Sequence, residues 1–135
     1  MIQERSFYTS HNIFTKLTHE QGLLSDLHYN LLDYWFKNDG PAVRPDLFIY
    51  LKTPVELCME RMVSRNRHAE HEVPADYLRA VSHMHEKMFV TQAHELECQV
   101  SVIETGTSIT IPEIGSDIVR IIARAQLDQN THNGY

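Results

Sequence analysis

Two groups of charged residues in this sequence have the chemistry of a site that handles phosphate. The first is Glu4 with Arg5, which follow a short apolar stretch at the N-terminus. A carboxylate holds Mg²⁺ directly or through water. A neighbouring guanidinium stabilises the charge that develops on a transferring phosphoryl group. The pair is therefore a candidate metal–phosphate site, and a plain surface ion pair is the alternative interpretation.

The second group is Arg61, Arg65 and Arg67, three of the chain's eight arginines within seven residues. Arg61 and Arg65 are four residues apart, so they share one face of a helix, and Arg67 follows at its end. Arginine binds two phosphate oxygens at once, which lysine cannot do. The cluster is a candidate phosphate site. A solvated basic face balanced by Glu60, Glu70 and Glu72 is the alternative.

Nine histidines and two cysteines raise two further hypotheses, a metal site and nucleophilic catalysis. His83 and His85 are two residues apart on a predicted helix, so they cannot face one ion. No cysteine stands at ligand spacing, and no His-Glu-x-x-His occurs. The histidines are therefore expected to be exposed or locally bonded, and Cys58 to pack in the core. No arrangement of Ser, His and Asp favours nucleophilic catalysis.

The spacing of apolar residues predicts helices that alternate with strands. Helices are expected at 7–17, at 23–37, from Thr53 to about Arg65, from about Tyr77 to His94, and from Pro112 onward. Strands are expected at 47–51 and 99–104, with residues 1–3 as the end of another. Thr53, Pro54 and Glu56 fit an N-cap, a first helical position and a capping box. The helix at 23–37 carries one apolar face, formed by Leu24, Leu27, Leu31, Tyr34 and Trp35.

This alternation indicates an α/β fold with a parallel sheet. The run at 47–51 is apolar throughout, which is typical of a fully buried strand. Ligands of open parallel sheets lie beyond the carboxyl ends of the strands, where this chain has Lys52, Thr53 and Glu104. Two full strands are few for five helices, so we expect part of a larger domain.

Composition narrows the class of protein. The chain has 135 residues, 42% of them hydrophobic, which fits one globular domain at most. A net charge of -6 argues against a general nucleic-acid binder, and no apolar run is long enough to cross a membrane. No signal peptide or disulfide framework is evident. We expect a protein of the cytoplasm, or of the mitochondrion if a targeting segment precedes Met1.

Taken together, these segments resemble the deoxynucleoside kinase family, the group of thymidine kinase 2, deoxycytidine kinase, deoxyguanosine kinase and the insect multisubstrate kinase. Residues 4–8 resemble the family's Glu-Arg-Ser motif after its third strand. Residues 45–53 resemble its fourth strand, and residues 65–70 the Arg-x-Arg-x-x-Glu of its lid. Residues 73–78 and 83–86 are similar to the lid's exit and the following helix. The matches keep the family's order and spacing.

The resemblance implies a reaction, in which the γ-phosphoryl group of ATP passes to the 5′-hydroxyl of a deoxynucleoside. By the same resemblance Glu4 helps to hold Mg²⁺, and Arg5 lies near the 5′-hydroxyl and the transferring phosphoryl group. Arg65 and Arg67 are lid arginines that close over the phosphates. Arg61 lies beside the nucleotide.

The resemblance also implies three contacts with the deoxynucleoside. Glu70 accepts a hydrogen bond from the sugar 3′-hydroxyl, and Phe14 stacks on the nucleobase. Ser10 occupies a base-discriminating position, where Asp accompanies deoxycytidine and purine enzymes and Ala accompanies pyrimidine-preferring ones. Because Ser10 is small and uncharged, it favours a pyrimidine-accepting site.

The sequence departs from the family in one large respect. It contains no Gly-x-x-x-x-Gly-Lys-[Ser/Thr] phosphate-binding loop, and the family's general base has no counterpart. We therefore expect residues 1–127 to be the C-terminal part of a kinase domain, with a lid at about 61–74 and a disordered tail at 128–135. The sheet would be a partial P-loop-kinase-like sheet. The chain alone would be inactive or nearly so.

Two other functions stay open. One is a non-catalytic module that dimerises through helices 7–20 and 75–94, the family's dimer interface, or that binds nucleotide through its arginines. The other is a fragment of a nucleoside monophosphate kinase, a class that also has an arginine-rich lid.

Overall fold

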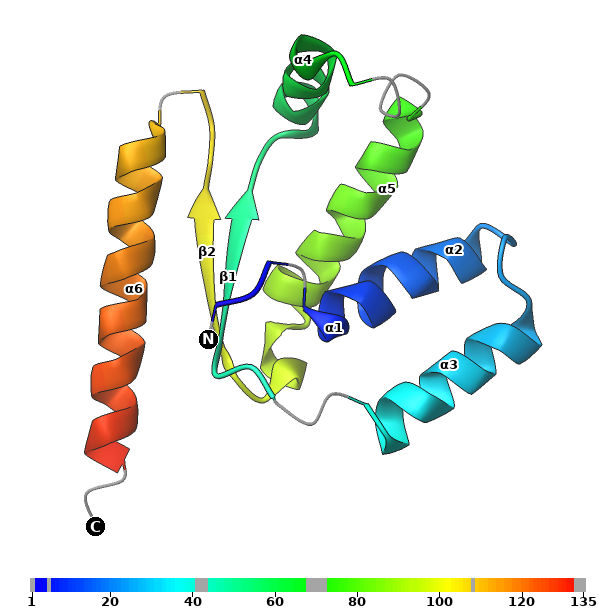
Figure 1. Cartoon of the computed structure of the whole chain (residues 1–135), viewed down its shortest axis with the longest axis horizontal. Coiled ribbons are helices and arrows are strands. Elements are labelled where there is room, and N and C mark those ends of the chain that lie inside the picture. The colour runs from blue at the N-terminus through cyan, green and yellow to red at the C-terminus, as the bar shows by residue number, and fades with distance from the viewer. Residues whose placement is uncertain (1, 5, 41–43, 68–72, 108, 133–135) are drawn as a thin grey trace.

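The computed structural model describes residues 2–4, 6–40, 44–67, 73–107 and 109–132. A sheet of two parallel strands, β1 (Leu47–Lys52) and β2 (Gln99–Glu104), lies at its centre (Figure 1). The register pairs Leu47 with Gln99 and Lys52 with Glu104, so the two strands begin and end together. Both strand predictions and the parallel α/β class are confirmed. Most of the described chain between the strands is helical, as is usual for the long crossover that a parallel pair needs.

Helices form most of the remaining chain. In chain order they are α1 (Phe7–Thr9), the π-helical segment η1 (Ser10–Thr15), α2 (Lys16–Glu20), α3 (Asp26–Asn38), α4 (Val55–Arg65), α5 (Ala75–Glu86), the π-helical segment η3 (Lys87–Thr91), the 3-10 turn η4 (Ala93–Leu96) and α6 (Ile111–His132). The first three follow one another without a break, so the helix predicted for residues 7–17 runs on to Glu20. No helix among the described ranges is long and apolar enough to cross a membrane.

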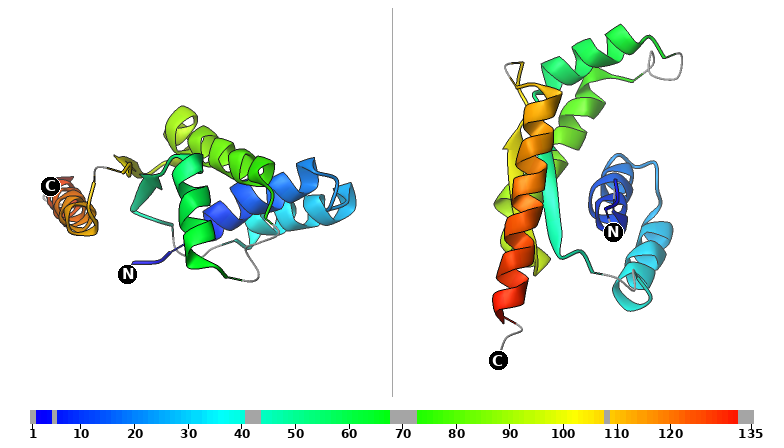
Figure 2. Two further views of the ribbon diagram at one scale, coloured as in Figure 1. Left: turned by 90° about the horizontal axis from the view of Figure 1, so that it is seen from above. Right: turned by 60° about the vertical axis from the view of Figure 1, so that its left-hand side comes forward.

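The helices lie on two sides of the sheet. α6 lies beside β2, whereas α5, the helical stretch from Phe7 to Glu20 and α3 follow one another on the other side (Figures 1 and 2). The buried core joins these elements and consists of Ile13, Phe48, Met84, Met88 and Phe89. This core fixes the position of α5 against β1, and both elements contribute to the site described below.

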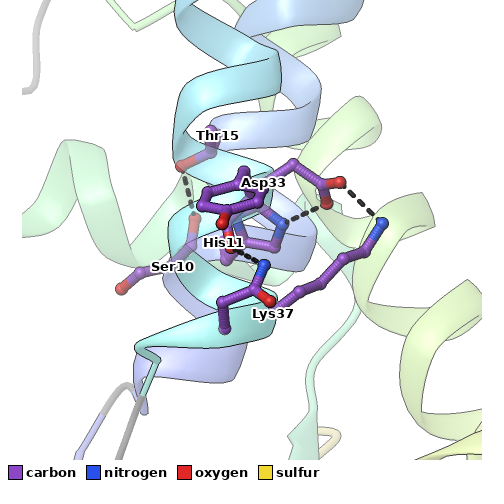
Figure 3. A network of polar contacts seen from close by, with 7 residues as sticks. Ser10, His11, Thr15, Asp33 and Lys37 are labelled. Carbon is purple, nitrogen blue, oxygen red and sulfur yellow. Dashed lines mark hydrogen bonds and ion pairs between the residues drawn. The ribbon is translucent and has the colours of Figure 1, made fainter.

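His11 and Asp33 join the first helical stretch to α3 (Figure 3). His11 is only 8% exposed, and its Nε2 donates to Asp33 Oδ1 at 3.1 Å. The other oxygen of Asp33 binds Lys37 Nζ at 2.6 Å, and the His11 ring stacks on Phe36 with centroids 4.2 Å apart. The prediction that the histidines are exposed or locally bonded is therefore wrong for His11, whose partner lies 22 residues away.

The apolar face predicted for the helix at 23–37 is present, but much of it faces solvent. The exposed fractions are 67% for Leu27, 59% for Leu31, 65% for Tyr34 and 44% for Trp35. α3 is the outermost helix on its side, and it turns Asp33 and Phe36 toward the first helical stretch instead.

Two predictions about strands are wrong. Ile2 and Gln3 form no strand, and Ile2 is 86% exposed. β1 is not fully buried, because Phe48 alone is buried and Leu51 is 44% exposed. The physical reason is the small sheet: within the described ranges β1 has β2 as its one neighbour, which leaves its other edge without strand pairing.

The helix ends also differ in detail from the prediction. Pro54, not Thr53, occupies the N-cap position of α4, and no side chain caps it, so the predicted capping box is absent. At the start of α6, Glu113 accepts hydrogen bonds from the backbone N–H of Thr110 at 2.7 Å and from its hydroxyl at 2.8 Å. α6 continues to His132, past the expected tail boundary at Asp128, and residues 133–135 lie outside the described ranges.

Candidate active site

The carboxyl ends of the two strands carry one cation between two carboxylates. Lys52 Nζ lies 2.9 Å from Glu86 Oε1 and 3.4 Å from Glu104 Oε1. The hydrogen bonds that the Lys52 ammonium donates, first to Glu86 and then to Glu104, raise the pKa of Lys52. The sequence placed Lys52 and Glu104 at this edge, and the parallel register confirms it. Glu86, at the end of α5, had no predicted role, because its approach depends on how α5 packs.

Two threonines tie the ends of the strands together. The backbone N–H and the hydroxyl of Thr105 both donate to Lys52 O, at 2.7 and 3.1 Å. Since that hydroxyl already donates its proton, the Thr53 hydroxyl donates to Thr105 Oγ1, 2.5 Å away. Thr105 is buried, and its hydroxyl both donates and accepts a hydrogen bond, as buried polar groups usually do.

An aromatic cluster lies directly beside this edge. Phe14 meets the His85 ring edge-on with centroids 6.1 Å apart, and His85 stacks on Tyr50 at 5.7 Å. His85 Nδ1 is 2.8 Å from Val81 O, so Nδ1 carries the proton. Burial, and then the charge of Glu86, raise the pKa of the Tyr50 hydroxyl. The Phe14–His85–Tyr50 arrangement joins η1, α5 and β1, a combination that sequence periodicity cannot reveal.

Ser10 and Phe14 share the π-helical segment η1. They are four residues apart, about one turn of this wider helix, and Ser10 is exposed while Phe14 is partly buried. The Ser10 carbonyl accepts a hydrogen bond from the Thr15 hydroxyl at 3.1 Å, which is visible in Figure 3. The structure thus places the two predicted nucleoside-contacting residues on one helical segment, and their contacts with substrate stay predictions.

The three arginines lie on and just after α4. Arg61 and Arg65 are exposed on the helix, which ends at Arg65 as the sequence predicts. Asn66 then adopts a left-handed conformation with φ 48°, and Arg67 follows it. α4 begins just beyond the carboxyl end of β1, so this helix lies at the same end of the sheet as the strand-end residues (Figure 1).

Of the remaining predicted residues, the structure describes Glu4 alone, and Glu4 is not joined to this edge. Glu4 is exposed in an irregular stretch, and Figures 1 and 2 show the N-terminal stretch well below α4 along the strand direction. Arg5 and Glu70 lie outside the described residues, together with His68 and His71. One carboxylate suits Mg²⁺ when phosphates supply further oxygens. Among the side chains that the structure describes, no three metal-binding groups lie together.

Comparisons of the sequence with known proteins show the family to which the chain belongs. The sequence model of the family described as deoxynucleoside kinase matches residues 1–125. A probable deoxycytidine kinase of fowlpox virus is 34% identical over 106 residues, which cover 77% of this chain and 45% of the viral protein. Human mitochondrial thymidine kinase 2 is 32% identical over 93 residues, 66% of this chain and 34% of the human protein.

A deoxyadenosine kinase of Dictyostelium discoideum is 38% identical over 78 residues, 57% of this chain and 31% of its own length. The matched part of this chain therefore spans between 31% and 45% of the length of these relatives. The match to the family covers nearly the whole chain. It includes the strand ends, the aromatic cluster, and α4 with the arginines on and just after it. The chain belongs to the deoxynucleoside kinase family.

Proposed function

We propose that this chain supplies the nucleoside-contacting and phosphate-closing part of a kinase that transfers the γ-phosphoryl group of ATP to the 5′-hydroxyl of a deoxynucleoside. The observation that supports this most is the position of the Phe14–His85–Tyr50 cluster beside the carboxyl ends of both strands. Aromatic rings offer a surface on which a nucleobase can stack, and strand ends are where parallel sheets bind ligands.

The charged residues complete the proposal. Arg61, Arg65 and Arg67 stand on the side of the sheet where the phosphates would lie, and they would balance the charge of the transferring group. The resemblance to the family, and not this geometry, in which Glu4 lies away from the strand ends, supports two further roles. Glu4 would help to hold Mg²⁺, which supplies charge neutralisation at the phosphates, and Arg5 would approach the reacting oxygen. The Glu70 carboxylate would accept a hydrogen bond from the sugar 3′-hydroxyl. Phosphoryl transfer depends mainly on positioning and on charge stabilisation, which these residues are suited to provide.

The 135 residues contain no phosphate-binding loop of the Gly-x-x-x-x-Gly-Lys-[Ser/Thr] type. We therefore infer that the isolated chain binds a deoxynucleoside weakly and transfers phosphate slowly or not at all. Such a loop, supplied together with a general base, would complete the reaction.

Saturation-transfer NMR tests nucleoside binding by the isolated chain. Thymidine, deoxycytidine and deoxyadenosine are offered at millimolar concentration, and the protein's aromatic protons are irradiated. We expect the strongest transfer to base protons, with loss of most of it in Phe14→Leu. Phe7→Leu is the matched control, because Phe7 is on the same helical stretch but contacts Trp35. Absence of transfer to any nucleoside, or equal transfer in both variants, contradicts the proposal.

Pyrimidine deoxynucleosides are the proposed substrates. Ser10 brings no charge to the base, and two of the relatives are named as a deoxycytidine kinase and a thymidine kinase. The Dictyostelium relative is named as a deoxyadenosine kinase, which is why the purine belongs in the test. We propose the cytoplasm as the compartment, and the mitochondrion is the alternative because the human relative is named as mitochondrial.

A homodimer through helices 7–20 and 75–94 is the second candidate function. Phe7 is 43% exposed and Val90 is 52% exposed, so each segment offers an apolar side chain to a partner. Sedimentation equilibrium of the chain and of Val90→Asp would test this. A monomer at high micromolar concentration would rule out self-association through these helices.

A further inference from the structure

A second hollow lies at the opposite end of the sheet from the candidate active site. We name it the amino-end pocket; it has a volume of about 530 Å³, and Lys16, Lys37, Arg44 and Lys87 are among its lining residues. Its walls come from the first helical stretch, the end of α3, the segment before β1, and α5 with η3. Volumes between roughly 300 and 1,000 Å³ are usual for small-molecule sites.

The amino-end pocket is separate from the candidate active site around Lys52 and Glu104. Arg44 and Pro45 line it just before β1 begins at Leu47, whereas Lys52 stands at the far end of that strand. Five residue steps at about 3.3 Å each separate the two strand ends by roughly 16 Å. Met84 and Lys87 flank His85 and Glu86 in the chain, but none of Phe14, His85 and Tyr50 lines this pocket. A ligand here would therefore leave the aromatic cluster beside Phe14 free.

The lining concentrates positive charge in a chain whose net charge is -6. Three of the four lysines in the sequence line this one pocket, together with Arg44. Two carboxylates, Glu95 and Glu97, also line it. The four cations exceed them, so the pocket has an excess of positive charge.

Two of the cations already have partners. Lys37 binds Asp33 at 2.6 Å, and Arg44 binds Glu97 at 2.6 Å. Lys16 and Lys87 form no ion pair with any acidic side chain of the described residues, although both are partly buried. Two unpaired ammonium groups that face one hollow repel each other unless an anion lies between them.

The remaining lining combines the polar side chains of Asn12, Asn38 and Gln92 with a group of apolar and aromatic residues. The rings of Tyr8 and Phe36 meet edge-on with centroids 5.5 Å apart, and the buried side chains of Met84 and Met88 complete the wall. Thioether and aromatic groups accept a flat ring, while the lysines attract phosphate oxygens. An inorganic ion would fill only a small part of this volume.

We propose that the amino-end pocket binds a nucleoside diphosphate, with its phosphates between Lys16 and Lys87 and its base against Tyr8 and the two methionines. This site is additional to the proposed nucleoside site and does not depend on it. It would let the chain respond to the cell's nucleotide supply without competition at the strand ends.

Methionine methyl groups report on the two sites separately. Met84 and Met88 line the amino-end pocket, whereas Met59 and Met62 lie on α4 near the arginines. The chain with ¹³C-methyl methionine is titrated with ADP, with inorganic pyrophosphate and with adenosine. We expect ADP to shift the Met84 and Met88 methyl signals in a saturable way, pyrophosphate to shift them less strongly, and adenosine to shift them only weakly.

Charge-neutral variants test the assignment to the lysines. Lys16→Gln combined with Lys87→Gln should weaken ADP binding at Met84 and Met88 about tenfold, as expected when charge-assisted hydrogen bonds are lost. Each single variant should show part of the effect. Arg79→Gln is the control, because exposed Arg79 pairs with Asp76 outside the pocket. Circular dichroism checks that each variant folds.

Three outcomes would overturn the proposal. The first is that ADP moves no methionine signal. The second is that it moves only Met59 and Met62, which places binding at the strand-end side and leaves the proposed kinase site intact. The third is that Met84 and Met88 shift equally in the wild type and in the lysine variants. If ADP shifts Met84 and Met88 but no nucleoside binds beside Phe14, the amino-end pocket is supported and the proposed nucleoside site is contradicted.

Discussion

The ammonium of Lys52 lies 2.9 Å from the carboxylate of Glu86, and this pair links the carboxyl end of β1 to the last turn of α5. The residue before Glu86 is His85, whose ring contacts both Phe14 and Tyr50. The ion pair therefore holds the aromatic wall next to the strand ends, where the proposed phosphoryl transfer takes place.

The pKa of Tyr50 reports on this arrangement. Burial raises it above 10.0, the charge of Glu86 raises it further, and the charge of Lys52 lowers it. Glu86→Gln should therefore move the pKa of Tyr50 back toward its ordinary value, and Lys52→Met should move it upward. NMR of ¹³Cζ-labelled tyrosine during an alkaline titration measures both. Shifts of the same sign in the two variants would contradict the geometry.

Acid should weaken the link between the first helical stretch and α3. The hydrogen bond from Lys37, and then that from His11, outweigh burial and hold the pKa of Asp33 below its ordinary value of 3.8. A carboxyl whose pKa is lowered on folding stabilises the fold above its unfolded pKa, and this contribution is lost as pH falls through the folded pKa.

Asp33→Asn isolates this effect. The variant should be less stable than the wild type at neutral pH, and the difference in unfolding free energy should shrink between about pH 5 and about pH 2. Urea unfolding followed by circular dichroism across that range gives the comparison. A difference that stays constant with pH would mean that Asp33 acts through packing alone.

The hydroxyl pair of Thr53 and Thr105 should show measurable coupling. Thr105→Val removes a buried hydroxyl that donates to Lys52 O and accepts from Thr53, so we expect a loss of about 1 to 2 kcal/mol. Lys52 O keeps the bond from the Thr105 backbone N–H, which limits the cost.

A double-mutant cycle with Thr53→Val isolates the pair. The coupling free energy from urea unfolding should reach about 0.5 to 1 kcal/mol. Strictly additive losses would show that the two hydroxyls do not bond to each other in solution.

Local patterns account for the part of this molecule that the sequence could predict. The apolar runs around Phe48 and Val102 predict two parallel strands, and the register then brings Lys52 to Glu104. The end of α4 at Arg65 also follows from a local change to polar residues. In each case the neighbours along the chain carry the information.

Contacts across the fold could not be predicted in this way. The meeting of Glu86 with Lys52, and of His11 with Asp33, depends on how helices pack. The apolar face around Leu27 was correct as a pattern, but periodicity does not say which way a face turns. The buried-strand prediction failed for a related reason, because burial of Leu51 requires neighbours that the described sheet does not provide.

The most direct test of the central claim is a phosphoryl-transfer assay on a completed domain. Residues 1–135 are joined behind the N-terminal part of human thymidine kinase 2, and transfer from [γ-³²P]ATP to thymidine and deoxycytidine is measured with Mg²⁺ present. We expect transfer by the chimera and none above background by the 135-residue chain. Arg65→Gln with Arg67→Gln should lower the rate at least about 100-fold, because such arginines stabilise the transition state, and Arg79→Gln should not. A folded chimera that transfers no phosphate, or one that is indifferent to the two arginines, would contradict the account.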